Sequence, residues 1–308
     1  MKKLLFTFLA GFIGFTSYGQ ADEIIDGKSL IKAYISPLGN SFGAALNNGW
    51  YNTAKPHKLG GFDVTITANI VIVPPNAKTF NVSESNGNTF KGVETPTILG
   101  NGNGSQVTYS EAQYDMPKGL NIPVIPLPML QAGVGLIKST EIDVRYMPEL
   151  KICKAGKMGL FGIGLKHDIL QWLPIVDKIP IDLSVQAGYT KLSSEIKLIE
   201  PTSTTSPQAN LDVSATTINL ILSKKLLMFT PYLGLGYNST KTTFNINGDY
   251  NIAGLPIDID ELTKLDFESN NFRANIGFRF NIAVLALQAN YTFAEYPTAT
   301  LGLGVSLR

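Results

Sequence analysis

A glycine-spaced apolar pattern recurs four times along the chain, at residues 132–136, 161–165, 233–237 and 301–305. In each stretch, apolar residues occupy every second position and glycines stand between them. A period of two is the side-chain period of a β-strand, so each strand has one apolar face. Glycine weakens a strand interior and often marks a site where another segment approaches closely. The pattern therefore predicts a closed barrel that is apolar outside and partly filled inside.

The first residues predict export. Two lysines precede an apolar run over residues 4–15, and the small residues Ser17 and Gly19 follow. This arrangement is typical of a secretory signal, which we expect to cover residues 1–19 and to be cleaved. The alternative is a membrane anchor, but the apolar run is shorter than the roughly 20 residues that a spanning helix needs.

Composition then restricts the class of protein. Hydrophobic residues make up 44% of the chain and charged residues only 16%, whereas soluble domains carry about 25% charged residues. An outer-membrane barrel resolves this, because its lipid-facing residues alternate with polar ones. The formal net charge of +1 gives no reason to expect nucleic acid or an acidic partner. The lone cysteine, Cys153, has no partner for a disulfide or a metal site, so we expect no cofactor.

Residues 20–58 differ from the rest and predict an amphipathic helical segment. Apolar residues share one helical face, namely Leu30, Ile31, Tyr34 and Ile35. Pro37 and Gly39 are expected to end this helix, and a second short helix is expected to stop before Gly49. Such a segment either plugs the barrel or forms a periplasmic arm, and we favour the plug because barrel lumens are often occluded.

Residues 59–308 predict an antiparallel up-and-down barrel of about fourteen strands, with ten as the lower bound. The clearest alternation covers residues 179–190, and separate strands are expected at 192–200, 229–239 and 240–248. Tight turns are expected at residues 138–139 and at Lys191, and long loops at 201–207 and 247–262. Short turns at one end and long loops at the other are typical of outer-membrane barrels.

Residues 116–129 contain four prolines. Proline cannot donate to a strand ladder, so this segment is not expected to form a central strand. Because it is apolar and stiff, we expect it to cross the barrel mouth or to insert inward. Its part over residues 123–130, together with Ile31, Tyr34 and Ile35, would line an apolar path.

The polar residues that alternate with the apolar ones along each strand are predicted to face the lumen. Eight of these residues are candidate lumen or ligand residues: Asp143, Arg145, Lys166, Asp168, Asp182, Gln186, Arg273 and Arg279. Both signs of charge are present, whereas an ion-selective pore tends to carry one sign. The mixture predicts a narrow interior bridged by ion pairs, with glycine-bare patches for a plug. The alternative is that each charge only holds the barrel closed.

Aromatic residues near the strand ends predict a girdle at the membrane surface: Tyr146, Trp172, Tyr189, Tyr237, Tyr291 and Tyr296. His167 falls on the lipid-facing parity. A lipid hydrolase at the barrel rim would need a serine beside this histidine, but Ser184 has the opposite parity. We therefore expect no catalytic residue and interpret His167 as an interfacial side chain.

The sequence also resembles an uncharacterised family of Gram-negative outer-membrane proteins. The resembling segments are residues 30–48, 58–62, 128–135, 145–148 and 164–169. That family is similar in outline to the FadL-like transporters of long-chain fatty acids and other hydrophobic compounds. The likeness implies a monomeric barrel whose plug and lateral opening pass apolar molecules.

The combined hypothesis is a barrel in the bacterial outer membrane that binds or passively transfers a fatty-acid-like molecule. Its expected partners are the lipid of that membrane and the hydrophobic ligand. The alternative is a sealed barrel that stabilises the envelope or docks a partner through its long loops.

Overall fold

The computed structural model describes most of the chain after residue 26, namely residues 27–82, 93–109, 112–152, 156–172, 180–197, 208–247 and 264–307. The expected signal, Cys153 and the expected loop at 201–207 lie outside these residues, as does nearly all of the expected loop at 247–262. Within the described residues, no helix is both long enough and apolar enough to cross a bilayer.

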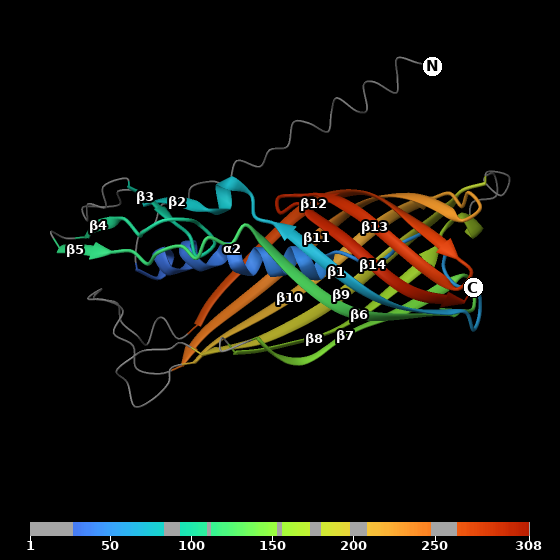
Figure 1. The fold of residues 1–308 in the computed structure, drawn as a ribbon, viewed down its shortest axis with the longest axis horizontal. Helices are drawn as coiled ribbons and strands as arrows, with labels where there is room; N and C mark the ends of the chain where they lie inside the picture. Colours follow the sequence, from blue (N-terminus) through green and yellow to red (C-terminus); the bar gives the residue numbers. More distant parts are fainter. Residues whose placement is uncertain are drawn as a thin grey trace, which may run out of the picture.

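Among the described residues, ten antiparallel strands close into a barrel (Figure 1). They are β1 (Phe62–Ile72), β6 (Val124–Leu136), β7 (Thr140–Ile152), β8 (Gly156–Asp168), β9 (Asp182–Lys197), β10 (Gln208–Ser223), β11 (Phe229–Asn247), β12 (Lys264–Ile282), β13 (Leu285–Phe293) and β14 (Thr298–Leu307). Each strand pairs with its neighbour in the sequence order of these ten, and β1 closes the ring by pairing with β14 and β6. The closed barrel confirms the predicted fold class, whereas the expectation of about fourteen barrel strands is wrong.

The predicted number of barrel strands is too high for two reasons. First, strands expected to be separate are continuous: β9 runs through Lys191 without a turn, and β11 joins the two strands expected on either side of Thr240. Second, the weaker early strands lie outside the barrel in two small hairpins, β2 (Thr79–Val82) with β3 (Val93–Pro96), and β4 (Gln106–Tyr109) with β5 (Ala112–Asp115).

These hairpins and the 3-10 turn η1 (Pro75–Ala77) form a cap between β1 and β6, at one end of the barrel (Figure 1). We call this the cap end. The opposite end, the turn end, carries the tight turns at residues 137–139 and 283–284 and the short turn η2 (Leu170–Trp172). The predicted tight turn is confirmed, with positive φ at Lys138 (54°) and Ser139 (47°).

Among the described residues, one α-helix, α2 (Gly27–Asn47), runs along the barrel axis and projects from the cap end (Figure 1). Pro37 lies inside this helix instead of ending it, so two separate helices are not formed. The barrel holds the helix together, because Gly39 and Gly43 let it lie directly against the wall. A Cβ at Gly43 would stand 2.3 Å from the Thr240 side chain. The helix ends where predicted, before Gly49, whose φ is +76°.

Along the long strands, the apolar residues change from outward-facing to inward-facing positions partway up the wall. On the turn-end part of β11, Leu233 and Leu235 face outward and are 51% exposed. Beyond Tyr237 the outward residues are polar, as at Lys241, and the inward Phe244 is buried. The turn-end half is therefore apolar outside and polar inside, as in a bilayer. In the cap-end half, β8 to β12 are polar outside and apolar inside, whereas β1 and β6 keep apolar outer residues up to Ile72 and Val124, which are 38% and 44% exposed.

Aromatic side chains mark the level of this reversal. Tyr146 pairs with Phe161, and Tyr237 pairs with Phe272. The exposed girdle therefore includes the predicted Tyr146, Tyr189 and Tyr237, while Trp172 is 62% exposed at the turn end. Tyr296 does not belong to it, because its side chain is only 4% exposed and packs inside the cap-end half.

Candidate functional site: a plugged lumen and a seam in the wall

The chain after α2 fills the polar half of the barrel. Trp50 is 1% exposed and lies over the glycine-bare wall of β8 and β9. A Cβ at Gly164 would stand 2.6 Å from its ring, and one at Gly188 would stand 2.4 Å away. Tyr51 lies in the same way over Gly234 and packs edge-on against Tyr232, with 6.0 Å between ring centroids. The bare patches predicted for a plug are therefore occupied by this segment.

Three buried arginines of the wall hold the plug by its polar groups. Arg145 donates to the Leu46 carbonyl at 2.9 Å, and Arg273 donates to the Asn47 carbonyl at 2.6 Å. These carbonyls end α2, where the helix dipole is negative and cations are favourable. Arg145 also lies 3.6 Å from the centre of the Trp50 ring, and Arg279 donates to Asn52 at 2.6 Å.

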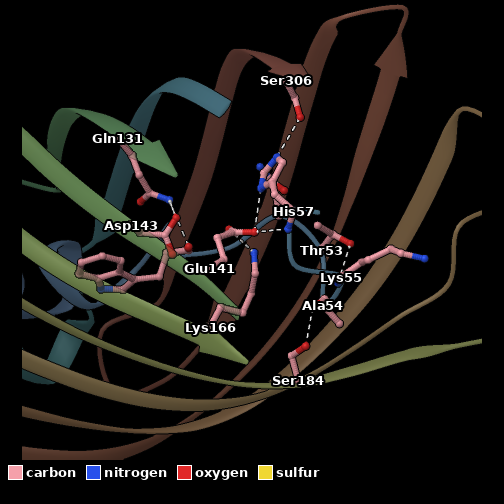
Figure 2. Close-up of polar contacts among 12 residues, drawn as sticks. Thr53, Ala54, Lys55, His57, Gln131, Glu141, Asp143, Lys166, Ser184 and Ser306 are labelled. Carbon is pink, nitrogen blue, oxygen red and sulfur yellow. Dashed lines mark hydrogen bonds and ion pairs between the residues drawn. The ribbon is translucent and has the colours of Figure 1, made fainter. Parts of the chain in front are cut away.

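Nearer the turn end, a buried ion network ties the plug to β7, β8 and β14 (Figure 2). One Glu141 oxygen accepts from the Lys166 ammonium at 2.6 Å. The other lies 2.7 Å from both the backbone nitrogen and Nδ1 of His57. His57 Nε2 lies 3.2 Å from the Ser306 hydroxyl. Because Glu141, Lys166 and His57 are at most 2% exposed, this link is shielded from water and salt.

Two further carboxylates face each other across β6. One oxygen each of Asp63 and Asp143 lies within 3 Å of the position where a Cβ of Gly133 would be. The second oxygen of Asp143 is buried without a partner. Gln131 bridges this carboxylate to the plug through the Trp50 carbonyl at 3.2 Å. In the described part of the chain, no group of acidic, histidine or cysteine residues has the arrangement of a metal site.

The predicted lumen residues do face the interior. Six of them are at most 3% exposed: Asp143, Arg145, Lys166, Gln186, Arg273 and Arg279. Asp182 and Asp168 lie at the turn end, where Asp182 is 3.6 Å from Lys55 and Asp168 accepts from the Leu170 backbone at 2.9 Å. Lys166 forms an ion pair with Glu141, but the two residues lie opposite each other on the neighbouring strands β8 and β7, so this pair runs along the wall and does not bridge the lumen. That any of these residues contacts a ligand remains a prediction.

The predicted apolar residues of the helix lie in the cap-end half. Ile31, Tyr34 and Ile35 pack into one apolar core with residues from β6 to β12. Strand β6 contributes Ile125, Leu127 and Met129 to that core. The structure therefore brings together the helix face and the proline-rich segment that were predicted to line one apolar path.

Strand β6 contains Pro126 and Pro128, which corrects the expectation that this segment forms no strand. It pairs with β1 throughout, up to Ile72 with Val124. Its pairing with β7 stops at Leu130 with Tyr146. Beyond that pair, described residues 124–129 and 147–152 have no ladder between them. We call this break in the wall the seam.

The seam has a sequence cause. The Gly135 amide donates to the carbonyl of Gly61, the residue before β1. The backbone N–H groups of odd-numbered residues of β6 therefore point toward β1, and those of even-numbered residues point toward β7. Pro126 and Pro128 therefore lack the N–H groups that β7 would need. Pro148 removes a donor from the opposite strand, inside a register shift between Met147 and Leu150. Prolines do not exclude the strand, but they open one of its two edges.

His167 lies at the outer rim of the turn end with both ring nitrogens engaged. Nδ1 is 2.9 Å from the Thr140 hydroxyl, and Nε2 accepts from the Trp172 indole at 2.9 Å. Ser184 points the other way and donates inward to the Ala54 carbonyl. Ser184 is therefore not paired with His167.

Sequence reasoning misses the most tightly held plug residues. It gives neither His57 nor Trp50 a role. One available indication is that Gly164 and Gly188 leave a bare patch that needs a large apolar partner, and Trp50 closely follows the helix. The contact of His57 with Glu141 joins residues 84 positions apart, and nothing in either local pattern predicts it.

The chain belongs to the family described as "Family of unknown function (DUF6588)", which matches residues 1–307. This confirms the resemblance to an uncharacterised family. None of the curated proteins matches it.

Solved structures similar to the chain include the translocator domain of the autotransporter NalP from Neisseria meningitidis. It is 10% identical with a TM-score of 0.36, covering 90% of this chain and 96% of that one. Ail, the attachment invasion locus protein of Yersinia pestis, is 10% identical with a TM-score of 0.31, covering 80% and 97%. The toluene transporter TbuX of Ralstonia pickettii is 7% identical with a TM-score of 0.27, covering 86% and 92%.

Proposed function

We propose that this protein is a bacterial outer-membrane barrel that binds, and passively transfers, a fatty-acid-like hydrophobic molecule. The observation that carries the proposal is the seam between β6 and β7, where the strand ladder stops in front of an apolar core. The apolar outer belt of the turn-end half supports the membrane location, because such a surface would be unfavourable in water. Short turns lie on the periplasmic side of such barrels, which places the cap end outside.

The side chains behind the seam suit a hydrophobic guest. Met129, Met147 and Met158 are buried there beside Leu160. Methionine is unbranched and adapts its shape to irregular partners. The seam begins at Tyr146 of the aromatic girdle, so a molecule dissolved in the outer leaflet would reach it without crossing a polar surface.

Binding can be measured with a tryptophan in place of Tyr34, in a chain that also carries Trp172→Phe. We expect saturable fluorescence changes with palmitic acid and none with glucose. Replacing Pro126, Pro128 and Pro148 together by valine restores three N–H donors and favours a closed ladder. We expect this triple variant to bind palmitic acid with an association rate slower by about tenfold or more, as for sites that must open first.

The matched control is Pro231→Val in β11, which removes a strand proline far from the seam and should bind at the original rate. Each variant must show the heat-dependent electrophoretic shift of a folded barrel. Absence of saturable binding by any hydrophobic ligand, or an unchanged rate in the triple variant, would contradict the proposal.

A second candidate is a sealed barrel that docks a partner with its cap, and the buried attachment of the plug favours it. It requires that the protein conducts no ions in a planar bilayer and takes up no ligand. Removal of the cap hairpins over residues 79–115 would then abolish partner capture while the barrel remains folded.

A further inference from the structure

A small polar recess lies between α2 and the inner faces of β11 and β12, at the level of the aromatic girdle. Carboxamides and hydroxyls dominate its lining, which includes Asn40, Asn47, Asn48, Asn238, Asn271 and Tyr296. The remaining lining residues are Thr240, Ser269 and two alanines, so the lining carries no charged side chain. The recess lies apart from the seam, on the other side of the barrel.

One buried atom in this recess lacks a partner. The Asn47 side chain is 1% exposed, and its amide nitrogen donates to the Thr240 hydroxyl at 3.3 Å. Its carbonyl oxygen, Oδ1, has no hydrogen-bond donor. A buried carbonyl oxygen without a donor is destabilising. The site therefore calls for a donor from outside the chain.

The other amides around Asn47 are already held in place. Asn48 donates to the Ala44 carbonyl at 2.8 Å and accepts from Thr292 at 2.6 Å. Asn271 is hydrogen-bonded to Glu295, and Asn40 to Tyr296. These bonds fix the side chains that surround the unpartnered oxygen.

The wall beside the recess is incomplete. Strand β13 pairs with β12 only as far as Phe293 with Ala274. Residues 264–273 of β12 therefore have no strand partner on that side among the described residues. The enclosed part of the recess is about 10 Å³, which is room for one water molecule or one hydroxyl group.

We propose that this recess binds a neutral saccharide, with one sugar hydroxyl donating to Asn47 Oδ1. A hydroxyl both donates and accepts hydrogen bonds, and so does a carboxamide, whereas an ionic headgroup would require a countercharge. Phe272 and Phe293, next in sequence to the lining, are 77% and 58% exposed on the outer face of the wall, where the β12–β13 ladder ends. They offer an apolar surface to the carbon-bound hydrogens of the ring. The inference does not depend on the seam or on the proposed ligand of the apolar core.

The test uses the full chain with ¹⁵N-labelled asparagine, purified in dodecyldimethylamine oxide, which has no sugar headgroup. Maltose and dodecyl maltoside are titrated separately while the side-chain amide resonances are recorded. We expect saturable shifts of Asn47, Asn238 and Asn271. A response to both compounds indicates a site for free saccharide, and a response to dodecyl maltoside alone indicates a glycolipid headgroup. Either result supports the proposal.

Two variants separate binding from folding. Asn47→Leu removes the unpartnered carbonyl, and Asn271→Leu alters a half-buried wall position; each should weaken binding by about tenfold or more, as expected for a lost hydrogen bond in a desolvated site. Asn270→Leu, on the outer face of the same strand, is the matched control and should bind normally. The proposal is overturned if neither sugar shifts the three amides, if dodecylphosphocholine shifts them equally, or if folded Asn271→Leu binds like the control.

Discussion

Trp50 packs on Gly164 and Gly188. This packing predicts that a methyl group added at position 188 destabilises the native chain but not a chain that lacks the Trp50 side chain. In the native chain, Gly188→Ala places a Cβ 2.4 Å from the Trp50 ring. Overpacking of this kind costs about 1–3 kcal/mol. Trp50→Ala removes a fully buried indole and should cost about 3–5 kcal/mol. In the double variant, the methyl group introduced at position 188 enters the vacated space, so Gly188→Ala should become neutral or stabilising.

The assay is equilibrium unfolding by urea in detergent micelles, followed by the electrophoretic shift of the folded barrel. The coupling energy between the two substitutions should be about 1–3 kcal/mol, which lies within the range for residues in contact. Gly302→Ala is the control, because its Cβ would meet Gln288 and not the plug. Its cost should be equal with and without Trp50. If Gly188→Ala costs the same in both backgrounds, Trp50 does not lie over β9 and the plug assignment fails.

Two further outcomes follow from the buried network and from the direction of α2. Glu141→Gln leaves the Lys166 ammonium buried without its counter-ion and should lower the free energy of unfolding by about 3–5 kcal/mol. Adding Lys166→Met should recover much of this loss. A Glu141→Gln protein that is as stable as the native chain would show that the pair is not formed. In a Cys153→Ser background, a membrane-impermeant maleimide should label Lys32→Cys on intact cells but label Lys138→Cys only after lysis. The opposite labelling would invert the orientation of the barrel.

The sequence predicts the membrane half of the fold well because each strand there follows one rule. In that half, residues of one parity face lipid and those of the other face the lumen, so the pattern places both Leu233 and Arg279 correctly. Above the girdle the rule reverses: beyond Tyr189 and Tyr237, the outward-facing residues are polar and the inward-facing ones are apolar. Such a reversal looks like a strand end, and therefore the pattern divides β9 and β11 each into two strands.

The plug can be predicted only in part, for a related reason. A helix inside a barrel does not follow the rules for a helix in water, because the wall supplies the packing that compensates for Pro37 and the two glycines after it. Local propensity predicts a break at this point, and tertiary contact with Thr240 overrides it. The attachment through His57 and Glu141 depends on long-range register, which neither residue's neighbours encode.

The reversal of polarity also determines where a hydrophobic ligand would have to act. Below the girdle the interior is polar and filled, and any path through it must displace Trp50 and break the buried links at Arg145 and Glu141. Above the girdle the interior is apolar, and the seam already interrupts the wall beside Met147. Binding there would leave the polar links of the plug intact, whereas passage to the periplasm must break them. Glu141→Gln weakens the attachment of the plug. If this variant binds the ligand normally but transfers it faster, binding and transfer are separate steps.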